Sequence, residues 1–87
     1  MWDWARGQAE RREAPRERGP FAAVVRLYSG QSQPCIVLNL SETGAKLALI
    51  RNGTLPKEFE LLVPAKNASW RVRVVWQDER ELGVYRV

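Results

Sequence analysis

The residues best suited to bind an anion form an arginine cluster near the start of the chain. Arg12 and Arg16 follow an Arg-x-x-x-Arg spacing with Arg11 beside them, and Pro15 and Pro20 oppose a helix in this segment. In an extended chain, Arg12 and Arg16 project to the same side about 13 Å apart. This distance suits a ligand larger than a single nucleotide. A charge run of this kind is also typical of a solvated basic linker.

A second polar set, Asn39-x-Ser41-x-x-Gly44, lies within a stretch predicted to form strand, tight turn and strand over residues 35–49. In the first strand, alternation places Ile36, Leu38 and Leu40 on the core side and Val37, Asn39 and Ser41 on the other side. In the second strand, Ala45, Leu47 and Leu49 share one side. In the turn, Gly44 can take a positive φ and lets another molecule approach the backbone. The alternative is an ordinary hairpin with polar residues at its tip.

The rest of the sequence predicts short strands that would position these residues. The expected strands cover residues 21–28, 35–41, 45–49, 59–63, 68–77 and 82–87. In the fifth strand, the side predicted to face the core carries Trp70, Val72, Val74 and Trp76. Such a pattern predicts an all-β fold, a small six-stranded antiparallel β-barrel over residues 21–87. Residues 1–20 are then an extended, mobile N-terminal arm that carries the arginines.

Composition excludes several classes of function. The chain has 87 residues, a net charge of +4, no histidine and one cysteine, so it forms one small domain without a large catalytic cleft. Because the sequence has no histidine, Ser41 lacks the base of a serine hydrolase, and the commonest zinc ligand is missing. Cys35, as the single cysteine, cannot form an internal disulfide. We therefore expect no enzyme activity, no metal and no cofactor. Lacking a membrane-spanning run or a signal peptide, the protein is expected to be cytoplasmic.

The two polar sets occur in a recognisable order. Arg12-x-x-x-Arg16 followed by Asn39-x-Ser41-x-x-Gly44 resembles the paired signature of the PilZ domain family. The end of the chain is also similar to the end of that family's barrel, in Val74-Val75-Trp76 and Leu82-Gly83-Val84. The resemblance covers the sequence from Glu10 onward.

This resemblance implies binding of cyclic di-GMP, a bacterial second messenger with two guanines and two phosphodiesters. The ligand-binding residues that it implies are Arg11, Arg12, Arg16, Asn39, Ser41 and Gly44. The last two arginines would hold phosphates and guanine edges with their planar forks, and the first would assist them. The asparagine and serine would hydrogen-bond a guanine, and the glycine would allow its close approach.

The function that follows is a receptor or adaptor that orders its N-terminal arm on ligand binding and signals to a downstream protein partner. One alternative is a small nucleic-acid-binding barrel, which the expected core position of Trp70 and Trp76 opposes. The other is a PilZ-like protein-interaction module that has lost ligand binding.

Overall fold

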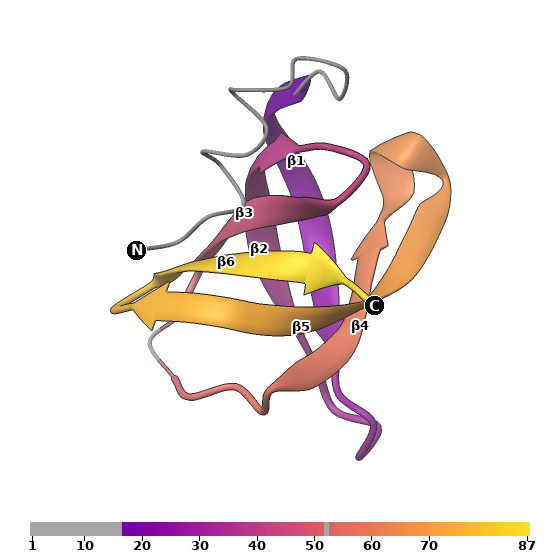
Figure 1. The fold of residues 1–87 in the computed structure, drawn as a ribbon. Coiled ribbons are helices and arrows are strands. Elements are labelled where there is room, and N and C mark those ends of the chain that lie inside the picture. Colours follow the sequence, from indigo (N-terminus) through magenta and orange to yellow (C-terminus); the bar gives the residue numbers. More distant parts are fainter. Residues whose placement is uncertain (1–16, 52) are drawn as a thin grey trace.

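The computed structural model describes residues 17–51 and 53–87, which form a closed antiparallel β-barrel (Figure 1). Its elements are β1 (Glu17–Arg26), β2 (Ser32–Leu40), β3 (Gly44–Leu49), β4 (Glu58–Val63), the short 3-10 helix η1 (Pro64–Lys66), β5 (Ala68–Asp78) and β6 (Glu81–Arg86). Around the barrel the strands follow the order β1-β2-β3-β6-β5-β4. The predicted six-stranded antiparallel barrel is confirmed.

The barrel closes where the end of β1 pairs with β4. Val24 lies opposite Leu62 and Val25 opposite Leu61, so the first strand completes the sheet that the fourth strand would otherwise leave open. Aliphatic side chains with one phenylalanine fill the interior, the largest fully buried ones being Phe59, Leu47, Leu61, Leu82, Val25 and Val37. This core fixes the strand register, because a slip of one residue would turn each buried side chain outward.

Strand β1 begins at Glu17, earlier than the expected start at Phe21. The additional residues pair with the end of β2, where Glu17 lies opposite Leu40, and a register shift between Arg18 and Phe21 accommodates Gly19 and Pro20. A Cβ atom on Gly19 would lie 2.1 Å from the backbone oxygen of Val37. Glycine is therefore required here, because the two backbones approach too closely for any side chain.

The predicted core side of β2 is wrong in its first half. Cys35 and Val37 are buried together with Leu40, whereas Ile36 and Leu38 are only partly buried. A register shift between Val37 and Asn39 explains the difference, since the extra residue reverses the alternation within the strand. Asn39 faces outward, as expected. On β3, Ala45, Leu47 and Leu49 lie on one side as predicted, and the structure shows that this side faces the core.

A second irregularity changes the position of one tryptophan on β5. Trp70 and Val74 pack against the core and Val72 is buried within it, as predicted. The register then shifts between Val74 and Trp76. Trp76 pairs with Gly83, which lies between the inward-facing residues of β6, so the expected core position of Trp76 is wrong and its side chain is on the outer face.

Candidate functional site

The register shifts align one row of outward-facing residues across five strands. Arg18 on β1 lies opposite Asn39 on β2, which lies opposite Lys46 on β3; Lys46 lies opposite Gly83 on β6, which lies opposite Trp76 on β5. We call these five residues the outer row. Neighbouring strands in a sheet lie about 4.8 Å apart. Two cations, an amide and an indole are therefore within reach of a single ligand of dinucleotide size.

Asn39 has a hydrogen-bonding requirement that the described part of the chain does not meet. Its side-chain oxygen Oδ1 is buried and has no hydrogen-bond partner among residues 17–51 and 53–87. A buried acceptor without a donor costs about 1–3 kcal/mol. Beside it, Lys46 forms an exposed ion pair with Glu81, with Nζ and Oε1 3.4 Å apart. Neighbouring residues of the outer row thus combine a cation with an acceptor that no described residue satisfies.

The turn between β2 and β3 is held by Ser41, which is only 5% exposed. Its backbone N–H donates to the oxygen of Gly44 at 2.9 Å, and its Oγ accepts from the N–H of Thr43 at 3.3 Å. The hydroxyl also donates to the oxygen of Gly44 at 3.5 Å. The expected outward orientation of Ser41 is therefore wrong, because the hydroxyl points back into its own turn.

Gly44 is the first residue of β3 and lies opposite Tyr85 on β6. Among the described residues, positive φ angles occur at Gly30, Asn67 and Glu79. The expectation of a positive φ at Gly44 is therefore wrong. Gly44 is buried on the outer side of the sheet, where the missing side chain leaves the backbone of the turn close to Lys46, the middle residue of the outer row.

An arginine lies at the end of the barrel beside this turn. Arg86 donates from Nη2 to the backbone oxygen of Ser41 at 3.0 Å, and its guanidinium stacks on Trp70 at 4.2 Å from the ring centroid. Burial lowers the pKa of Arg86, and the charge of Glu42 opposes that shift. Nε of Arg86 is buried without a partner among the described residues. Arg86 therefore fixes the turn to β6.

A cavity of about 330 Å³ opens at the same end of the barrel, and we call it the mouth cavity. Leu40, Ala68 and Trp70 form its apolar walls, and Glu17 and Lys66 form part of its rim. Lys66 and Glu17 form an ion pair, so the first residue of β1 is tied to η1. Glu17, which follows Arg16 in the sequence, therefore lies beside the β2–β3 turn.

A model of the PilZ domain matches residues 10–86 of the sequence. The chain belongs to the PilZ domain family. PilZ domains are non-catalytic receptor domains and are generally receptors for cyclic di-GMP. A comparison with curated proteins found no match.

The structure of this PilZ domain brings only part of the predicted site together. Asn39, Ser41 and Gly44 lie at and beside the β2–β3 turn, with Asn39 in the outer row. The predicted residues outside the described part of the chain are Arg11, Arg12 and Arg16. Sequence reasoning missed the remaining members of the outer row, because they come from four other strands and share no motif. Only the pairing register of the strands could have identified them.

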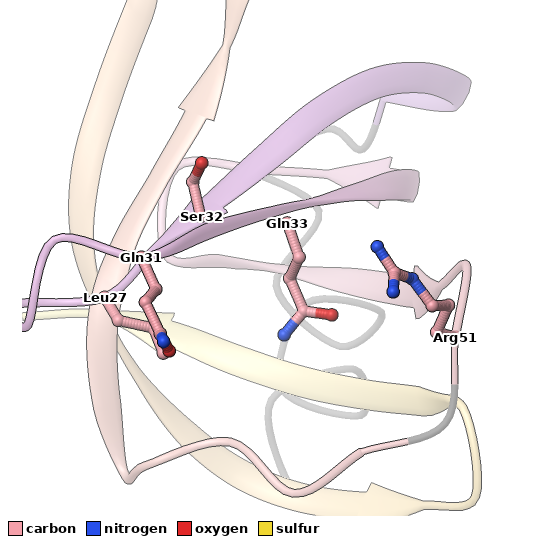
Figure 2. Close-up of a pocket in the computed structure, with 5 residues that line it drawn as sticks. All are labelled: Leu27, Gln31, Ser32, Gln33 and Arg51. Atoms are coloured by element: carbon pink, nitrogen blue, oxygen red, sulfur yellow. The ribbon is translucent and has the colours of Figure 1, made fainter.

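A second hollow, of about 500 Å³, lies at the opposite end of the PilZ barrel (Figure 2). It is lined by Leu27, Gln31, Ser32, Gln33 and Arg51. These residues come from the β1–β2 connection, the start of β2 and the end of β3 (Figures 1 and 2). These are the ends of β2 and β3 that lie away from the β2–β3 turn. None of the predicted ligand-binding residues lines it.

The described residues of this PilZ domain contain no group of histidine, cysteine, aspartate and glutamate side chains that could hold a metal ion. Within the same residues, no helix is long and apolar enough to cross a membrane.

Proposed function

We propose that this PilZ domain binds cyclic di-GMP on the outer face of the barrel, with the outer row under the ligand and the arginine cluster over it. The observation that carries the proposal is the buried Oδ1 of Asn39, which has no hydrogen-bond partner among the described residues and lies in a row that also presents cations and an indole. Guanine offers N–H donors to such an acceptor, and the row's cations suit phosphodiesters. Arg18, opposite Asn39 and exposed, adds a further guanidinium.

The start of β1 supports the placement of the arginine cluster. Glu17, which follows Arg16 in the sequence, lies opposite Leu40 at the end of β2. The motif therefore joins the barrel one residue from the β2–β3 turn and next to the outer row. From there Arg12 and Arg16 can reach phosphates and guanine edges, with Arg11 assisting, while their flat faces can stack on a base.

Ser41 contributes to the site mainly by stabilising the turn, since its hydroxyl already forms hydrogen bonds inside that turn. A direct contact between Ser41 and a guanine stays a prediction. Gly44 contributes a backbone that a base can approach closely. In this arrangement, Asn39 makes the direct hydrogen bond, and the turn fixes the angle at which the base meets the row.

Signalling follows from the position of the arginines on a segment that precedes the barrel. A ligand that contacts both the cluster and the outer row fixes that segment against β1 and β2, and so changes the surface offered to a partner protein. The ligand can drive this change only through contacts that it makes when the segment is fixed and not when the segment is free. The contacts between the arginines and the ligand are of this kind.

Calorimetric titration tests the proposal, with cyclic di-GMP compared with GTP, cyclic di-AMP and a short single-stranded RNA. We expect cyclic di-GMP to bind, and Arg12→Ala and Arg16→Ala each to weaken binding about tenfold or more, because charge-assisted contacts contribute about 1.5–3 kcal/mol. The matched control is Arg71→Ala, an exposed arginine on β5 opposite Glu60. Equal binding by all three variants, or preference for RNA, would refute the proposed site.

A further inference from the structure

The mouth cavity is suited to a single aromatic ring system. Its volume of about 330 Å³ lies near the lower limit of about 300–1,000 Å³ for small-molecule pockets. A dinucleotide with two guanines and two phosphodiesters is too large for it. The walls formed by Leu40, Ala68 and Trp70 are apolar, and Trp70 is only partly buried by the core.

Two of the cations that line the mouth cavity already contact other residues of the barrel. Lys66 pairs with Glu17 and lies over the ring of Phe21, 5.3 Å from its centroid. Arg86 stacks on Trp70 and donates to the turn. The cavity therefore offers an occupant mainly apolar contact with Leu40, Ala68 and Trp70, beside cations that already contact Glu17, Phe21, Trp70 and the turn.

The sequence contains a suitable occupant ahead of β1. Trp2 and Trp4 carry large apolar surface that is costly to leave in water. Glu17, where the described chain begins, is itself part of the cavity rim. The chain from Trp4 to Glu17 can span about 40 Å when extended, more than the 36 Å longest dimension of the structure. A tether of this kind raises the effective concentration of a group to about millimolar.

We propose that the segment Trp2–Trp4 docks on the mouth cavity of its own barrel and places an indole against Ala68 and Trp70. None of the outer-row residues lines the mouth cavity, although Ser41 of the β2–β3 turn does. Docking of the segment makes the N-terminus a part of the folded domain. The arginine cluster is then held at both ends, by the docked indole on one side and by β1 on the other.

Fluorine NMR of the full chain, labelled with fluorotryptophan, tests the proposal. In Trp2→Ala/Trp4→Ala, we expect the Trp70 resonance to shift while that of Trp76, on the outer face, stays in place. Ala68→Leu fills the cavity and should move the resonance of the docked indole toward that of a solvent-exposed one. Ala22→Leu, an exposed site on β1, is the matched control and should change neither resonance.

The double tryptophan variant leaves the barrel sequence intact, so its result stands even if Ala68→Leu does not fold. An unchanged Trp70 resonance in that variant overturns the proposal. A Trp70 shift that disappears on dilution also overturns it, because the occupant would then be a second copy of the chain. Loss of cyclic di-GMP binding in Arg12→Ala, with these resonances unchanged, would bear only on the ligand site.

Discussion

Trp76 and Gly83 are cross-strand partners on the outer face of the barrel, and Lys46 flanks Gly83 on its other side. Gly83 is buried although it faces outward and has no side chain of its own. The largest of its partners is the indole of Trp76, which is itself partly buried. The row from Asn39 through Lys46 therefore ends on an aromatic surface, on which a base of a bound dinucleotide can stack.

This position predicts that Trp76→Ala weakens cyclic di-GMP binding. Stacking of a base on an aromatic side chain is worth about 1–3 kcal/mol, so we expect a loss of about tenfold or more in affinity, measured by calorimetry. The control is Tyr28→Ala, an exposed aromatic residue in the β1–β2 connection at the opposite end of the barrel. A folded Trp76→Ala protein that binds like the parent would place the ligand elsewhere.

The sequence predicted the number of strands, the barrel and the alternation along β3, because these depend on patterns and turn residues that are local in the chain. It did not predict which way Val37 and Trp76 face. In β2 and in β5, the alternation of apolar residues continues through a register shift without any interruption that marks it. A single extra residue then reverses the two sides of the strand.

The candidate site was predicted in the same uneven way. The motif residues Asn39, Ser41 and Gly44 are close in sequence, and the structure places them together at one turn. Arg18 and Lys46 carry no signal of their own, since charged residues on strands are usually solvated. Only the pairing between strands that are distant in sequence places these two residues beside Asn39.

Ser41→Ala is expected to lower the stability of the fold as well as ligand affinity. The substitution removes the hydroxyl that accepts from Thr43 and donates to Gly44. A net loss of about 1 kcal/mol lowers the melting temperature by about 4–8 °C in a domain of this size. Ser29→Ala, in an exposed loop, is the control. An unchanged melting temperature for Ser41→Ala would show that the hydroxyl does not stabilise the turn.

Gly19→Ala should destabilise the start of β1. Its Cβ atom would lie 2.1 Å from the backbone oxygen of Val37, so one of the two strands must move. Overpacking of this kind costs about 1–3 kcal/mol, which urea unfolding can measure. Gly53→Ala is the matched control, because a Cβ atom there meets nothing within 4 Å. The displaced strand should also separate Arg18 from Asn39 and weaken ligand binding, and equal stability of the two variants would contradict this account.

Cys35 is predicted to be an unreactive thiol in the folded protein. It is 1% exposed, and burial raises its pKa from 9.0 to about 12. Only the thiolate is nucleophilic, so a disulfide reagent should modify Cys35 at the rate at which the barrel opens. Adding urea below the unfolding transition should accelerate the reaction as the barrel opens more often. Fast modification in the fully folded protein would show that Cys35 is accessible.

The same raised pKa predicts a loss of stability at alkaline pH. The unfolded chain releases the Cys35 proton near pH 9.0, whereas the folded chain retains it to about pH 12. The contribution of the protonated thiol to the free energy of unfolding is therefore complete below pH 9.0. It is lost as the pH rises toward 12, by at most about 1.4 kcal/mol per pH unit. Cys35→Ala removes this dependence, while its lost packing lowers stability equally at every pH. Urea unfolding of both proteins below and above pH 9.0 should therefore show their stabilities converging as the pH rises, and a constant difference would contradict the raised pKa.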